Sequence, residues 1–187
     1  MSDCSMPSDS VEKREITFES PVIMWGLMAA IVVFFVGGRF LFNVLWDGRE
    51  SLLQLDVPMW VKLTSILLAI LVHEGIHGLV FALYAPRGFK SVSFGFSKTM
   101  GSPYCHCADA IKVKHYRRAG IAPFIILGLF PLLFGLITGV QWITTFGLLL
   151  SGGGFGDLFV WIYLFRFDSN VMVRDHPEKM GFIIENP

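Results

Sequence analysis

Four long apolar stretches dominate the pattern of hydrophobic and polar positions along the chain. Each is long enough to cross the hydrocarbon layer of a membrane as a helix, which takes about 20 apolar residues. They cover residues 21–46, 58–84, 119–139 and 142–165. The pattern therefore predicts an α-helical integral membrane protein with four transmembrane helices, which form a single polytopic domain over residues 21–181.

The two ends of the chain are polar. Residues 1–20 are rich in Ser, Asp and Glu and hold too few apolar side chains to offset the entropy lost on ordering. They are predicted to form a disordered tail, and residues 182–187 a short C-terminal tail. The first apolar stretch is too long, and its leading segment too acidic, for a cleaved signal peptide.

The loop between the second and third spans, residues 85–118, has the alternation that is typical of β-structure. Apolar residues alternate with small or polar ones over 92–97, and a second alternating run covers 111–114. Turn-forming residues lie between the two runs at 99–103. The loop is therefore predicted to form a small β-hairpin at the membrane surface.

The positions of the positive charges predict the orientation. Lys and Arg residues concentrate in the 85–118 loop and also occur in both terminal segments, whereas the segment 47–57 holds only Arg49. Because cytosolic loops of membrane proteins carry the excess of Lys and Arg, this loop and both termini are predicted to be cytosolic. The second and fourth spans then run in the same direction. The expected location is the prokaryotic cytoplasmic (inner) membrane.

The composition agrees with a membrane domain. With 53% hydrophobic and 16% charged residues among 187, the chain is more apolar than one soluble core of this size requires. The formal net charge of +0 offers no electrostatic footprint for nucleic acid. Three cysteines, Cys4, Cys105 and Cys107, specify neither a disulfide framework nor a tetrahedral cysteine site.

The second span carries the sequence His73-Glu74-Gly75-Ile76-His77. Residues four apart on a helix project from one face, so both imidazoles can share one metal ion. Glu74 lies beside them and can take the proton of a water activated by the metal, as a general base. Zinc is the predicted ion, although iron or manganese accepts the same ligands. The alternative for the two histidines is a polar pair that neighbouring helices satisfy or that lines a water-filled path.

Depth in the membrane predicts the third ligand. His73 lies fifteen residues from Pro58 at the outer end of its span, and Asp157 lies fifteen residues from Trp142 at the outer end of the fourth span. At 1.5 Å per residue, both side chains are about 22 Å deep on parallel helices. The cluster of small residues at 151–156 lets another helix approach closely. Asp157 is therefore predicted to complete the metal site.

Other polar residues leave alternatives open. Asp157 could instead form an ion pair with Arg39, although Arg39 lies only about 10 Å below the outer end of its span and can extend outward. A second metal site could form from Cys105, Cys107 and either His106 or His115. His176 could fold back toward the first site from the cytosolic side, but a plain turn is the simpler interpretation.

These motifs together resemble a known family. The residues that carry the resemblance are His73-Glu74-Gly75-Ile76-His77, Phe94-Gly95-Phe96, Lys112-Val113-Lys114-His115-Tyr116 leading into Ala122-Pro123, Gly152-Gly153-Gly154-Phe155-Gly156-Asp157, and Asp175-His176-Pro177. They resemble an uncharacterised family of membrane zincin peptidases, a domain of unknown function with the HExxH motif. The resemblance covers about residues 58–181.

The layout is also similar to the site-2 proteases, which are intramembrane metalloproteases. In those enzymes two His of the motif and an Asp on a later helix hold zinc, and the Glu activates water. The similarity implies the same roles for His73, His77, Asp157 and Glu74. Two features differ, because Leu158 rather than Gly follows the aspartate and because no Asn-Pro motif occurs in the chain.

The sequence therefore predicts a membrane-embedded zinc metalloprotease that cleaves a membrane-bound protein or peptide substrate near the cytosolic side. An extended substrate could add as a strand to the edge of the hairpin. Two other functions use the same residues. A membrane carrier or channel could pass protons or divalent metal through the His, Glu and Asp cluster. A non-catalytic metal-binding scaffold is the third, although a closed structural site has no use for a base such as Glu74.

Overall fold

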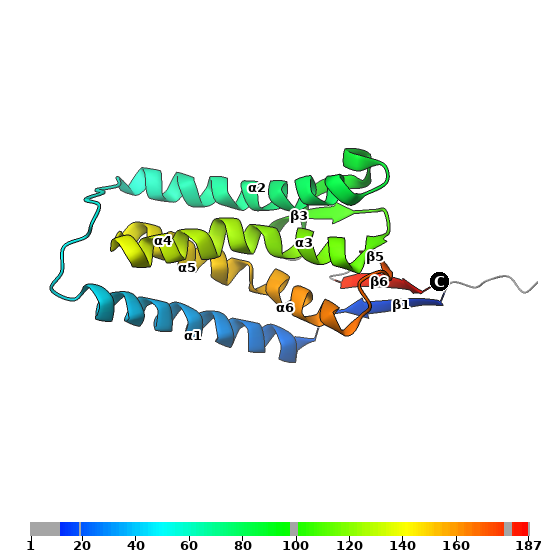
Figure 1. Cartoon of the computed structure of the whole chain (residues 1–187), viewed down its shortest axis with the longest axis horizontal. Helices are drawn as coiled ribbons and strands as arrows, with labels where there is room; N and C mark the ends of the chain where they lie inside the picture. Colours follow the sequence, from blue (N-terminus) through cyan, green and yellow to red (C-terminus); the bar gives the residue numbers. More distant parts are fainter. Residues whose placement is uncertain (1–11, 19, 98–100, 178–180, 187) are drawn as a thin grey trace, which may run out of the picture.

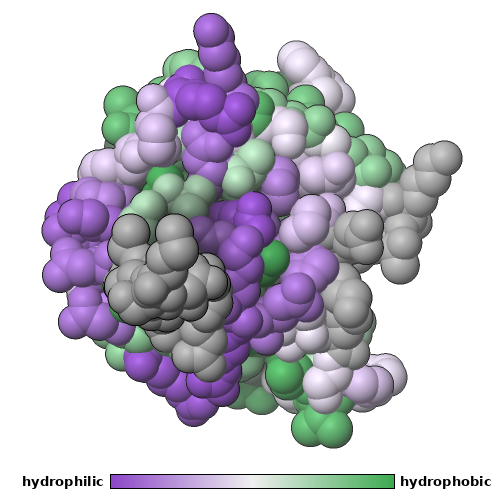
Figure 2. All heavy atoms as spheres, turned by 90° about the vertical axis from the view of Figure 1, so that its right-hand side faces the viewer, coloured by the Kyte–Doolittle hydropathy of each residue, from purple (hydrophilic) through white to green (hydrophobic). Residues whose placement is uncertain are grey.

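The computed structural model describes residues 12–18, 20–97, 101–177 and 181–186. Long helices lie side by side, and two small antiparallel sheets gather at one end of them (Figure 1). The described part of the chain is thus mostly helical, as predicted. Hydrophilic side chains cover much of the sheet end, and hydrophobic ones show at its rim (Figure 2).

The first two predicted spans are single helices, α1 (Pro21–Trp46) and α2 (Met59–Tyr84). Both helices are long and apolar enough to cross a membrane. No residue in the most apolar part of α1 is buried within the protein. A helix that exposes apolar side chains on this scale needs an apolar surrounding, which indicates a membrane protein.

The third span begins earlier than predicted and is irregular. It consists of α3 (Val113–Pro123), the π-helix η2 (Phe124–Leu129) and α4 (Phe130–Thr138). Together these pieces qualify as one membrane-spanning helix over Val113–Thr138. Pro123 and Pro131 donate no backbone hydrogen bond, and the wider π-helical winding lies between them.

The fourth predicted span is two helices that meet at an angle. Helix α5 (Gln141–Gly153) and helix α6 (Phe155–Tyr163, extended by the 3₁₀ turn η3, Leu164–Arg166) form a bent pair with an angle of 48°. The bend falls at Gly152-Gly153-Gly154, because glycine is a poor helix former. The described residues thus form three helices that are long and apolar enough to cross a membrane, or four if the bent pair is one span.

The loop between α2 and α3 contains a hairpin, but its second strand differs from the prediction. After the 3₁₀ turn η1 (Gly88–Ser91), strand β2 (Val92–Ser97) pairs antiparallel with β3 (Ser102–Cys107). The second alternating run contains instead the short strand β4 (Ile111–Lys112) and the start of α3. Pairing with the nearer segment closes a shorter loop and therefore costs less entropy. Residues 99 and 100 of the predicted turn lie outside the described residues.

The two terminal segments are not simple tails. Strands β1 (Glu12–Thr17) and β6 (Gly181–Asn186) pair with each other, and a four-stranded sheet has the order β1-β6-β5-β4, with β5 at Met172–Asp175. The prediction of tails at 1–20 and 182–187 was therefore wrong for these strands. The sequence did not predict β1, because most of this segment is charged and only Ile16 supplies a buried apolar side chain in the strand. Residues 1–11 lie outside the described residues.

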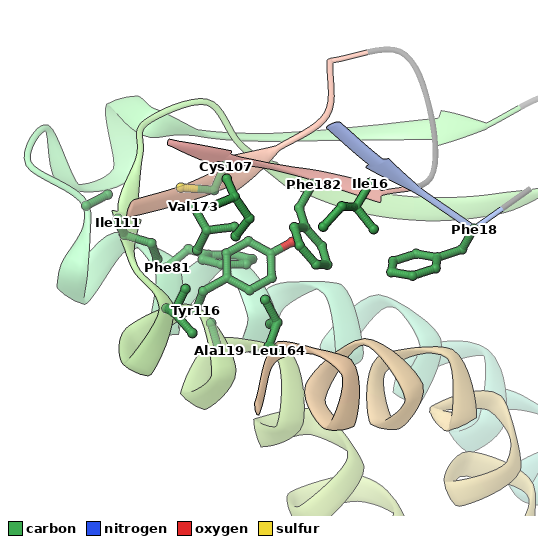
Figure 3. Close-up of a cluster of buried hydrophobic side chains, with 13 residues drawn as sticks. Ile16, Phe18, Phe81, Cys107, Ile111, Tyr116, Ala119, Leu164, Val173 and Phe182 are labelled. Carbon is green, nitrogen blue, oxygen red and sulfur yellow. The ribbon is translucent and has the colours of Figure 1, made fainter. Parts of the chain in front are cut away.

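The largest buried apolar cluster joins this sheet to the nearby helix ends (Figure 3). Tyr116 rises from α3 into the cluster, where its ring lies 5.2 Å from that of Phe81 on α2 and 6.2 Å from that of Phe182 on β6. The sheet, α2 and α3 therefore share one core, which fixes the strands relative to the helices.

The close packing of α4 against α5 is testable by substitution of one glycine. A Cβ atom at Gly147 would lie 2.3 Å from the backbone nitrogen of Leu132, so Gly147→Ala must push the two helices apart. We expect the free energy of unfolding to fall by about 1–3 kcal/mol, measured as a lower thermal midpoint of the purified protein in detergent.

Gly26→Ala is the matched control, because nothing lies within 4 Å of a Cβ at that exposed position of α1. Alanine favours a helix by about 1 kcal/mol over glycine, so this variant is expected to be at least as stable as the wild type. Equal thermal midpoints for the two variants would show that the α4–α5 contact is not tight.

Candidate metal centre

Two imidazoles from α2 face one another. The Nε2 atoms of His73 and His77 are 3.2 Å apart, and the ring centroids are separated by 4.8 Å. This arrangement follows from their spacing of four residues, which places them one helical turn apart on the same side of α2. Both side chains are largely shielded, with His73 17% and His77 10% exposed.

Asp157 comes to the same point from the first turn of α6. Its Oδ2 atom is 3.0 Å from Nε2 of His73, and its Oδ1 atom is 3.5 Å from Nε2 of His77. The three residues form the only cluster among the described residues in which at least three His, Cys, Asp or Glu ligand atoms lie within 4.8 Å of one another. The predicted trio is therefore assembled in space.

The ion pair that was the alternative for Asp157 is absent from the described residues. The guanidinium of Arg39 lies instead over the ring of Phe42, at 5.4 Å from its centroid. Its Nη1 atom is buried and has no hydrogen-bond partner among the described residues. Arg39 thus makes no contribution to the cluster.

A backbone carbonyl of α3 orients His77. The Nδ1 atom of His77 lies 2.9 Å from the carbonyl oxygen of Ala119. A carbonyl can only accept, so Nδ1 carries the hydrogen and donates it, and in the neutral ring Nε2 keeps its lone pair. That lone pair points at the cluster. Nothing in the sequence identifies Ala119, because its contribution is a backbone atom.

The donor set fits a zinc ion. Two unprotonated imidazole nitrogens and a carboxylate oxygen, with one position left open, are the ligands of a catalytic zinc site. In a tetrahedral site with Zn–N bonds of 2.0–2.1 Å, two nitrogens are ~3.3 Å apart. The separation of 3.2 Å between the Nε2 atoms matches this value. The hydrogen bond from His77 to a carbonyl is the outer-shell contact that metal-binding histidines usually make.

Glu74 lies beside the three residues but outside the ligand cluster. One residue along the helix is a rotation of about 100° from His73, so its carboxylate points toward the hairpin. There the backbone N–H of Cys105 on β3 donates to it. The side chain is partly buried and close enough to feel the charges of His73, His77 and Asp157. This placement leaves a carboxylate near the cluster and free of metal ligation.

The cysteines on β3 do not form a second site within the described residues. Burial raises the pKa of both thiols, that of Cys107 to about 11, so neither forms a thiolate readily. His106 lies between them in the chain, but its Nδ1 is 3.8 Å from Oδ2 of Asp175. Among the described residues, no group of three His, Cys, Asp or Glu ligand atoms gathers around these cysteines.

The two remaining histidines also lie elsewhere. The ring of His115 stacks on Tyr84 at a centroid distance of 4.1 Å. His176 does not fold back toward the cluster, because its Nε2 lies 3.7 Å from a carboxylate oxygen of Glu15 on β1. Both side chains therefore belong to the end of the protein that carries the sheet.

Comparison of the sequence with known protein families gives a match, whereas comparison with curated proteins and with solved structures gives none. The family described as "Putative zincin peptidase" matches residues 66–172. The matched segment contains the His-Glu-Gly-Ile-His motif and Asp157. Because the match covers more than half of the 187 residues, the chain belongs to this zincin peptidase family.

Proposed function

We propose that this protein is a membrane-embedded zinc metalloprotease that hydrolyses peptide bonds. His73, His77 and Asp157 hold the zinc, and Glu74 is the general base. The observation that carries the proposal is the convergence of two imidazole nitrogens and a carboxylate from two helices, with a second carboxylate adjacent. Membership of the zincin peptidase family supports the same chemistry.

Each residue has a defined task in this reaction. Zinc, when bound, polarises the peptide carbonyl and makes a water more acidic. The carbonyl of Ala119 holds His77 in the tautomer that binds metal. Glu74 takes a proton from the attacking water and delivers it to the amine that leaves. The N–H of Cys105 orients the Glu74 carboxylate for both transfers.

The site lies within the apolar part of the chain, which points to cleavage inside the membrane. His73 and His77 belong to α2 and Asp157 to the bent pair α5–α6, and all three helices contribute to candidate membrane spans. With the sheet and both termini on the cytosolic side, the site falls in the cytosolic third of the membrane. This layout resembles that of site-2 proteases, and the substrate is then a membrane-bound protein or peptide.

We further propose that an extended segment of substrate pairs with the edge of β3. This edge lies beside the site, since the N–H of Cys105 donates to Glu74. Backbone groups of a substrate segment that pair at the edge of the hairpin would be satisfied next to lipid, while the N–H of Cys105 continues to hold Glu74. Strand pairing would also hold the substrate unwound, as peptide-bond hydrolysis requires.

Replacement of the general base tests the proposal directly. Glu74→Gln keeps the size of the side chain but cannot take a proton, so peptidase activity is expected to fall by about 10²–10⁴-fold while bound zinc is retained. The assay follows cleavage of a reporter peptide chosen by mass spectrometry from a peptide library digested by the wild type. Undiminished cleavage by the zinc-loaded variant would reject Glu74 as the base.

Removal of the third ligand tests the metal site. Asp157→Ala leaves two imidazoles, and the zinc content measured by elemental analysis after dialysis is expected to drop from one ion per chain to a small fraction. Asp168→Ala is the matched control, because Asp168 is exposed and its carboxylate, among the described residues, accepts a hydrogen bond from the backbone N–H of Asn170 alone. Weak, exchangeable metal in the wild type, together with ion flux through proteoliposomes, would favour the carrier or channel instead.

N-methylation of the reporter peptide tests strand pairing. A methyl group on one backbone nitrogen removes one hydrogen bond, worth about 0.5–1.5 kcal/mol. We expect KM to rise by about 2–12-fold when alternate residues are methylated and to stay unchanged for the residues between them. A uniform effect at every position would show that the peptide does not bind as a strand.

A further inference from the structure

A buried carboxylate outside the metal centre joins the two elements that orient the site. Asp175 is the last residue of β5, and its side chain is 13% exposed. Its Oδ2 accepts the backbone N–H of Cys107 on β3 at 2.6 Å, and its Oδ1 accepts the hydroxyl of Tyr116 on α3. Among the described residues it has no Lys or Arg partner, and the Nδ1 atom of His106 lies 3.8 Å from its Oδ2 atom.

The two partners of Asp175 lie next to the residues that orient the site. Tyr116 is three residues before Ala119 on α3, and the carbonyl of Ala119 orients His77. Cys107 is two residues after Cys105 on β3. Because the direction of N–H groups alternates along a strand, both N–H groups point from the same edge. The N–H of Cys105 donates to Glu74. Asp175 therefore holds the two elements that orient the site: β3, which contacts Glu74, and α3, which contacts His77.

We propose that Asp175 is a positioning residue, which fastens β3 to α3 and thereby sets the place of the general base Glu74 relative to the metal ligand His77. The inference rests on the proposed function. The effect follows from geometry, because displacement of a catalytic group by about 1 Å can cost 10²-fold in rate.

The two hydrogen bonds use both carboxylate oxygens, and this makes Asp175→Leu a selective change. Leu has nearly the same branched shape as Asp but offers no acceptor. Both bonds, to Cys107 and to Tyr116, are therefore lost. Tyr116→Phe removes the second bond alone and keeps the ring in the core.

The experiment compares these variants in the full-length protein, with Cys4→Ser added to silence the thiol in the terminal segment. Four quantities are measured: zinc per chain, kcat and KM on the reporter peptide, and the rate at which maleimide labels Cys107, which tandem mass spectrometry distinguishes from labelling of the half-buried Cys105. Because Cys107 is fully buried in the wild type, labelling reports directly whether β3 has loosened.

We expect Asp175→Leu to keep one zinc per chain and a KM within about two-fold of the wild type, whereas kcat falls by roughly 10–100-fold. Maleimide labelling of Cys107 is expected to rise at least several-fold. Tyr116→Phe is expected to lower kcat and to raise the labelling rate of Cys107, each by a smaller factor, because the bond to Cys107 remains.

Asp109→Leu is the matched control for kcat. Asp109 is a second carboxylate near β3, but it accepts from Arg87 and Ser91 and does not reach α3. Its kcat is expected to stay within about two-fold of the wild type, since no contact between β3 and α3 is lost.

Three outcomes would overturn the inference. Wild-type kcat and unchanged labelling in Asp175→Leu would show that the residue does not fasten β3. Loss of zinc together with activity would show a general structural role rather than positioning of Glu74. Absence of peptidase activity in the wild type itself would reject the proposed function, and the inference with it. The wild-type assay therefore separates failure of the function from failure of this inference.

Discussion

The main physical constraint on this protein is the energetic cost of ionisable side chains inside apolar helices. Each such group in the middle of a spanning helix costs about 2.5–3.5 kcal/mol on insertion scales, and α2 carries His73, Glu74 and His77 within five residues. The structure meets this cost by contact between these groups and a few polar partners. Asp157 faces both imidazoles, Ala119 accepts from one of them, and Cys105 donates to the glutamate. A metal ion bound by these three side chains would also compensate the negative charge of the Asp157 carboxylate.

Close backbone approach is what allows the partners to reach one another. Asp has a short side chain, so α6 must come near α2, and the bend at the glycines before Phe155 redirects the chain there. Elsewhere in the bundle, α5 packs against α4 and the π-helix through glycine. A Cβ atom at Gly128, Gly135 or Gly147 would meet backbone atoms of the facing helix at less than 3 Å. In a membrane, where burial of apolar surface gives no drive between helices, such small-residue contacts supply the packing energy.

The metal trio could be predicted from the sequence, because it depends on regular geometry. The helical period places His73 and His77 on one face, and rise per residue places Asp157 at their depth. The partners that complete the site could not be predicted in this way. Ala119 and Cys105 act through backbone atoms, which are the same in every residue. The pairing of β1 with β6 joins segments at opposite ends of the chain, and local alternation carries no information about such a partner.

The terminal strands β1 and β6 shield contacts near the site from water, which two disordered tails would not do. Strand β6 lies between β1 and β5, so it covers β5 on one side, while β4 at the start of α3 covers the other. The side chains of Phe182 and Ile184 on β6 fill the core in which the ring of Tyr116 lies. Without this cover, Asp175 and the Tyr116 hydroxyl would be open to water, which competes for both hydrogen bonds and weakens them. The sheet therefore does more than close one end of the helices, since it keeps water away from the hydrogen bonds that join α3 and β3 through Asp175.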